Sequence, residues 1–85
     1  MEKFRVIIFV EDYDLGTSIV VQNDSYLMDV YKSILAKLKI PLPNKKEAVF
    51  SAKGKWTYAL GNKLEDLGKF NDDDLIFLSL WEQDY

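Results

Sequence analysis

The 85-residue sequence contains neither cysteine nor histidine. Without cysteine, disulfide bonds and thiolate metal sites are excluded. Without histidine, the sequence lacks the usual zinc ligand, the commonest general base, and the Ser-His-Asp and Cys-His pairings of nucleophilic catalysis. The sequence therefore predicts a protein that is not an enzyme and that needs no metal or cofactor.

Long hydrophobic runs are also missing. No apolar stretch approaches the roughly 20 residues of a membrane span. The apolar residues near the N-terminus run directly into Glu11 and Asp12 and lack a small-residue cleavage site. A hydrophobic content of 48% favours a folded chain over disorder. We expect one domain over residues 1–85, located in the cytoplasm and without direct membrane insertion.

Arginine is scarce, since Arg5 is the only one in a chain of net charge −3. Residues 32–55 hold seven lysines against Glu47, and the segments on either side are acidic. Nucleic-acid-binding domains usually carry a basic overall balance and arginines at base edges, so we expect no nucleic-acid partner. The lysines either solvate a helix end and two loops or form a basic docking patch. The candidates for such a patch are Lys37, Lys39, Lys45 and Lys46.

Hydrophobic periodicity predicts five strands and one helix. The strands, rich in β-branched and aromatic residues, are expected over 3–11, 17–22, 47–52, 56–60 and 75–81. Helical periodicity covers 26–40; the helix N-cap candidates are Asn23, Asp24 and Ser25, and Pro41 and Pro43 follow its end. A long loop over 61–74 is expected to be pinned to the core by Leu64, Leu67 and Phe70.

Three short motifs could carry chemistry, and each has a simpler structural interpretation. The segment 71–74 contains three consecutive aspartates that could bind a hard cation or supply a general acid and base, but acidic turns often precede strands. Residues 52–55 resemble the Gly-Lys of phosphate loops, yet they lack the glycine-rich loop and following helix, which favours a hairpin tip. Trp56, Tyr58 and Trp81 could stack on bases, although sheet packing is favoured without arginines nearby.

The order strand, strand, helix, strand, strand, strand resembles that of the ubiquitin-like β-grasp fold. This is an α+β arrangement, ββαβββ, in which a mixed sheet packs on one helix. The fold pairs its first and last strands in the centre, and segments 4–10 and 75–81 are the most apolar here. Ubiquitin-type modifiers end in Gly-Gly for conjugation, whereas this sequence contains no Gly-Gly. We therefore do not expect a conjugated modifier.

The segments FVEDYDLGTSIVV, MDVYKSILAKLKI and KLEDLGKFNDDDLIFLSL resemble the YukD/EsaB family of small ubiquitin-like proteins. That family belongs to the type VII (ESX-like) secretion systems of Gram-positive bacteria. Two departures are Asp73, where the family usually has glycine, and one extra residue between Leu64 and the acidic turn. The resemblance covers nearly the whole chain, but its motifs determine the fold rather than any chemistry.

The resemblance implies a protein-binding accessory subunit. Its partners would be membrane-anchored or cytosolic components of the secretion machine, and a homodimer is an alternative. Two other functions fit a small β-grasp protein. One is a non-catalytic subunit of a multicomponent enzyme such as an oxygenase, and the other is an RNA-binding β-grasp module.

A single helix can cover only one face of the sheet. Residue alternation assigns the following side chains to the covered face: Phe4, Val6, Ile8, Val10, Ile76, Leu78 and Leu80. The opposite face receives Ile7, Phe9, Phe77 and Trp81. Because monomers rarely expose large apolar patches unless something binds there, we predict that these four residues form a protein-docking surface. The lysine-rich segment is the alternative.

Overall fold

The computed structural model describes residues 2–42, 46–57 and 61–82, with residues 46, 47, 81 and 82 described by their backbone only. The strands are β1 (Phe4–Val10), β2 (Leu15–Val21), β3 (Lys46–Ala52), β4 (Lys55–Thr57) and β5 (Asp74–Glu82), and helix α1 (Leu27–Leu38) lies between β2 and β3. The sheet order is β2-β1-β5-β3-β4, with β1 and β5 parallel and the other neighbours antiparallel. This arrangement confirms the predicted mixed sheet with the first and last strands at its centre.

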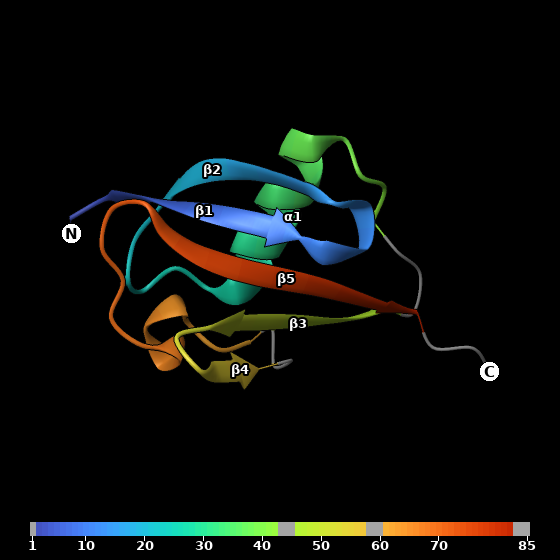
Figure 1. Cartoon of the computed structure of the whole chain (residues 1–85). Helices are drawn as coiled ribbons and strands as arrows, with labels where there is room; N and C mark the ends of the chain where they lie inside the picture. Colours follow the sequence, from blue (N-terminus) through green and yellow to red (C-terminus); the bar gives the residue numbers. More distant parts are fainter. Residues whose placement is uncertain (1, 43–45, 58–60, 83–85) are drawn as a thin grey trace.

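Helix α1 packs against one face of the sheet, and in the described part of the chain no helix lies over the other face (Figure 1). The core lies between α1 and the inward side chains of the central strands. Six of the seven residues predicted for the covered face are buried, and Phe4 is partly buried. Each fully buried aliphatic or aromatic side chain contributes about 1.5–3 kcal/mol. The main buried members from the helix and central strands are Val6, Ile8, Val10, Leu27, Val30, Tyr31, Ile34, Leu35, Ile76, Leu78 and Leu80.

The connection between β1 and β2 is shorter than predicted. A 3₁₀ turn, η1 (Glu11–Tyr13), is followed by Asp14 in the left-handed region, with φ 53°. Pairing resumes immediately, so that Leu15 faces Val10 and Gly16 faces Phe9. Aspartate tolerates left-handed backbone better than most residues, which lets one residue complete the turn. The second strand therefore begins at residue 15 rather than 17.

The predicted N-cap of the helix is wrong. None of Asn23, Asp24 and Ser25 occupies the N-cap position, which belongs to Tyr26 without a side-chain cap. The first backbone N–H of the helix, that of Leu27, instead donates to the Asn62 carbonyl at 2.8 Å. A chain segment distant in sequence thus satisfies a donor that a local side chain usually satisfies.

At its other end, α1 stops at Leu38, two residues before the predicted boundary. Lys39 adopts left-handed backbone, with φ 58°, and its N–H bonds back to the Ala36 and Leu35 carbonyls. This is the usual geometry of a helix C-terminus.

None of the helices within the described ranges combines the length and apolarity that crossing a membrane requires.

The hairpin predicted around residues 53–55 is confirmed. Lys53 and Gly54 both have positive φ, 53° and 78°. Two-residue hairpins of this handedness need positive φ at both central positions. The fourth strand was predicted over 56–60; its described part begins at Lys55 and reaches Thr57, and residues 58–60 lie outside the described residues.

The long loop is pinned to the core as predicted, since Leu64, Leu67 and Phe70 are buried. It also contains a 3₁₀ turn, η2 (Leu64–Leu67), that the sequence analysis did not predict. The Asp66 carboxylate accepts the Lys63 N–H at 2.8 Å and so stabilises the start of this turn. Local side-chain hydrogen bonds of this kind order a loop without a repeating apolar pattern.

Candidate functional site

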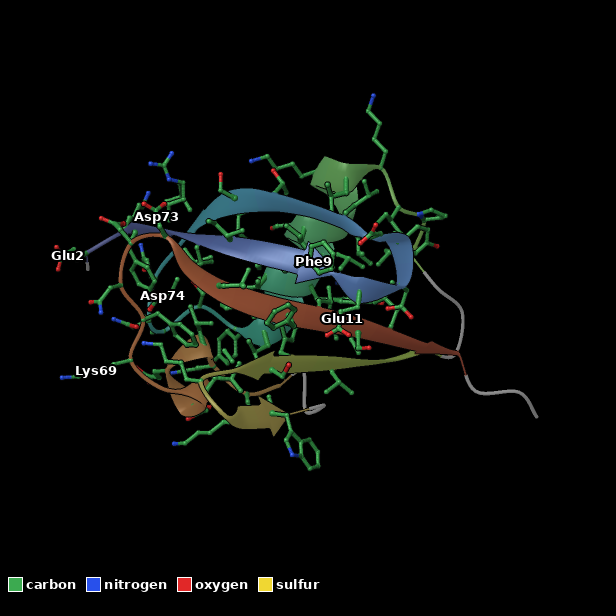
Figure 2. All side chains as sticks on the ribbon, in the orientation of Figure 1. Glu2, Phe9, Glu11, Lys69, Asp73 and Asp74 are labelled. Carbon is green, nitrogen blue, oxygen red and sulfur yellow. The ribbon has the colours of Figure 1, made fainter. Side chains whose placement is uncertain are left out.

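The structure brings together three of the four residues predicted for the docking surface. In the parallel pair of β1 and β5, Ile7 lies opposite Leu75 and Phe9 lies opposite Phe77. Their side chains occupy the face that α1 does not cover, and Figure 2 shows Phe9 on that face. Ile7 and Phe77 are each 37% exposed. The side chain of Trp81, the fourth residue, lies outside the described part of the chain.

Phe9 is held in place by its neighbours on both sides. Its ring meets the Phe77 ring edge to face, with the ring centroids 6.2 Å apart. On the other side it covers Gly16 of β2, where an added Cβ would lie only 3.2 Å from the Phe9 Cδ2 atom. Edge-to-face pairs contribute about 0.5–1.5 kcal/mol beyond their buried area. The two rings therefore form an ordered ridge across the centre of the sheet.

The apolar surface extends further than predicted. Leu75 is 46% exposed and Trp56 is 65% exposed. Trp56 pairs with Ser51, and Ser51 pairs with Phe77, so the three share one face. We call this surface the outer-face patch and define it as Ile7, Phe9, Trp56, Leu75 and Phe77.

Leu75 and Trp56 were not among the four residues predicted for the docking surface. Leu75 has the same parity along its strand as Phe77, so alternation could have identified it. Placing Trp56 on this face required the pairing register of the β3–β4 hairpin, which residue alternation alone does not provide.

A shallow groove of about 360 Å³ opens at one end of the outer-face patch. Trp56, Leu75 and Phe77 line it together with Ser51, while Lys53, Gly54 and Lys55 of the hairpin tip border it.

Acidic residues border the patch where β1 ends. Figure 2 shows that Glu11 lies over the same face as Phe9. The neighbouring Asp12 accepts the Leu80 N–H at 2.6 Å, which fastens the β1–β2 connection to β5. Glu11 and Asp14 take part in no ion pair within the described ranges. This border therefore carries negative charge that its described neighbours do not neutralise.

The predicted basic patch is only partly described. Lys37 donates a hydrogen bond to the Ser18 carbonyl of β2, so its ammonium group covers part of a sheet edge. Lys39 is exposed at the end of α1. Lys45 and the side chain of Lys46 lie outside the described residues. The structure therefore leaves the lysine-rich segment as an alternative docking surface.

The segment 71–74, which contains three aspartates, forms a turn, as its simpler interpretation predicted. The Asp72 carboxylate accepts the Arg5 N–H at 3.1 Å, and Asp73 lies 3.6 Å from the Arg5 guanidinium. Asp74 accepts the Asn71 N–H at 2.8 Å and pairs with Lys53 at 3.0 Å. The pKa of Asp74 is lowered, chiefly by the Asn71 hydrogen bond and then by Lys53. The three aspartate carboxylates thus stabilise the turn that leads into β5.

Lys53 has a structural role at the hairpin tip. Besides its pair with Asp74, it donates to the Lys69 carbonyl at 2.6 Å and lies 5.3 Å from the centre of the Phe70 ring. These contacts attach the β3–β4 hairpin to the long loop.

Within the described ranges, no cluster of three acidic residues could hold a metal ion.

A scan against known protein families finds no match, and no curated protein sequence matches either. Solved structures do resemble the chain. The ubiquitin-like domain of Plasmodium falciparum Dsk2 matches with a TM-score of 0.68 and 16% identity, covering 94% of this chain and 100% of that domain. A ubiquitin-like domain of an Arabidopsis thaliana protein matches with a TM-score of 0.69 and 11% identity, covering 99% and 87%. The chain therefore has the ubiquitin-like β-grasp fold that its sequence predicted.

Proposed function

We propose that this protein is a non-enzymatic, protein-binding accessory subunit that docks partners on the outer-face patch. The observation that carries the proposal is the ordered apolar ridge of Phe9 and Phe77 on a sheet face that no described element covers. A solvated sheet face does not require such residues. Exposed apolar clusters with a polar border are typical of protein interaction sites.

The proposed setting is a type VII secretion system, with membrane-anchored or cytosolic components of the machine as partners. The support for this setting is the resemblance of the sequence to YukD/EsaB proteins together with the ubiquitin-like fold. If it is right, affinity capture from the native host should recover secretion components. Consistent recovery of oxygenase subunits instead would favour the alternative of an enzyme component.

The docking surface itself is tested by the double variant Phe9→Ser with Phe77→Ser. We expect circular dichroism to show a retained fold, because both rings are partly exposed and their mutual contact contributes only about 1 kcal/mol. Capture of the partners should be lost, since central aromatic residues usually dominate binding.

A matched control removes two exposed apolar side chains from outside the patch. Met28 on α1 and Leu42 after it are 38% and 60% exposed, so Met28→Ser with Leu42→Ser changes surface apolarity without touching the sheet. The control should capture the same partners as the unmodified protein. Undiminished capture by the Phe9/Phe77 variant would move the docking site elsewhere, first to segment 32–55.

A further inference from the structure

Strand β2 forms one edge of the described sheet, with β1 as its neighbour on the inner side. Its seven residues, LGTSIVV, include no charged side chain and no proline. They pair one to one with β1, so no bulge interrupts the strand. Sheet edges are usually protected against pairing with another chain by a charge, a proline or a bulge. The sequence of β2 itself supplies none of these protections.

The hydrogen bonds of Arg5 show which backbone groups of β2 face the free edge. Arg5 lies opposite Val20, but its N–H and carbonyl are bonded to the acidic turn that leads into β5, on the other side of β1. Opposite residues of an antiparallel pair either bond to each other or both point away. The N–H and carbonyl of Val20 therefore face the free edge. Alternation along the strand places the backbone groups of Gly16 and Ser18 there as well.

The protection of this edge comes from helix α1, whose last turn lies beside β2 (Figure 1). The Lys37 ammonium group donates a hydrogen bond to the carbonyl of Ser18, the central residue of the strand. Among the described residues, no other side chain forms a hydrogen bond with the edge-facing groups of Gly16, Ser18 and Val20. Lys37 thus puts a positive charge where the backbone of an added strand would lie.

The edge is complementary to a second copy of itself. Antiparallel pairing about a two-fold axis at Ser18 places Ser18 opposite its counterpart and Gly16 opposite Val20. These pairs exchange about six backbone hydrogen bonds, and no charges on β2 meet. A second copy is also ordered as a strand beforehand, whereas a flexible peptide loses conformational freedom on binding. With Lys37 in place, however, two ammonium groups meet near the axis, and like charges oppose the pairing.

We propose that the free edge of β2 is a self-pairing surface that the Lys37 ammonium group blocks. While the charge is present, the chain stays a monomer. When the charge is lost, β2 of one copy pairs antiparallel with β2 of a second copy, and the two sheets become continuous. This surface is separate from the outer-face patch, because edge pairing uses backbone groups and leaves the rings of Phe9 and Phe77 uncovered.

The test compares the full-length variant Lys37→Met with the matched control Lys32→Met. Both lysines are exposed on α1, and methionine keeps a long side chain with good helix propensity. Lys32 forms no hydrogen bond or ion pair within the described ranges. Lys37→Gln repeats the measurement with a polar side chain, and circular dichroism checks that each variant folds. Sedimentation equilibrium measures association, and amide exchange by NMR locates it.

We expect Lys37→Met and Lys37→Gln to dimerise at least about tenfold more tightly than the unmodified chain, because like charges no longer meet at the axis. The amides of Gly16, Ser18 and Val20 should become protected in the dimer. Lys32→Met should behave as the unmodified chain does. Adding Ser18→Lys to Lys37→Met should restore the monomer, since it places two lysines directly opposite each other.

Three outcomes would overturn the proposal. The first is a pair of folded Lys37 variants that stay monomeric and exchange their edge amides as fast as the unmodified chain. The second is equal dimerisation of the Lys32 variant, which would assign the effect to the lost net charge. The third is a dimer that Ser18→Lys does not dissociate, which would place the contact away from β2.

Discussion

At the residue scale, the turn before β5 has an aspartate, Asp73, in a backbone conformation that favours glycine. Asp73 has φ 67°, a conformation that favours glycine, and it pairs with Arg5. Its neighbour Asp72 accepts the Arg5 N–H, and the Asp73 N–H donates to the Arg5 carbonyl at 2.7 Å. These contacts hold the start of β5 beside β1. Backbone strain at one residue is thus offset by hydrogen bonds from its neighbours.

Asp74 should make stability depend on acidity. Its pKa is lowered in the folded chain by the Asn71 hydrogen bond and Lys53. A lowered pKa means that the carboxylate stabilises the fold above the ordinary pKa of aspartate and loses this effect as the pH falls through the folded value. Asp74→Asn should therefore be less stable than the unmodified chain at neutral pH.

The measurement is urea unfolding of both proteins at several pH values. We expect the difference in unfolding free energy to shrink as the pH is lowered through the acidic range. A difference that stays constant with pH would show that the charge of Asp74 does not contribute.

At the element scale, α1 ends at a residue poorly suited to its backbone. Lys39 has left-handed φ and follows the last helical residue. Left-handed backbone costs a non-glycine residue about 1–2 kcal/mol, and glycine avoids this cost. Lys39→Gly should therefore raise the free energy of unfolding by about 1 kcal/mol and the Tm by about 4–8 °C.

The matched control places the same substitution inside the helix. Lys32 is exposed within α1, where glycine costs about 1 kcal/mol relative to good helix formers. Lys32→Gly should lower the Tm by a similar amount. Thermal unfolding in which both variants lose stability would show that the left-handed cap is not strained.

The element order could be predicted from sequence because local patterns determine it. Alternation in β1 and β5 and helical periodicity in α1 each correspond to one buried face. The N-cap could not be predicted, because the Leu27 N–H is satisfied by Asn62, which folding brings near from 35 residues away in the chain. The place of Trp56 in the candidate site could not be predicted for the same reason, since its neighbours are set by strand register.

At the scale of the whole molecule, the area of the exposed face determines association. The whole open face, with five strands about 4.8 Å apart and about seven residues long, measures roughly 550 Å², which lies in the range of weak contacts rather than stable dimers. We expect sedimentation equilibrium to give the monomer mass at concentrations of about 100 µM, where contacts of this size remain dissociated. A dimer that dissociates in the Phe9→Ser, Phe77→Ser variant would make a second copy the occupant of the patch.

The proposed function requires one face of the sheet to contact a partner, and cross-saturation NMR of the chain bound to its captured partner measures that contact directly. We predict saturation transfer to Ile7, Phe9, Leu75 and Phe77, with little transfer to the exposed residues Met28 and Lys32 of α1. Transfer confined to α1 or to the lysine-rich segment, with the outer-face patch unaffected, would contradict the central claim.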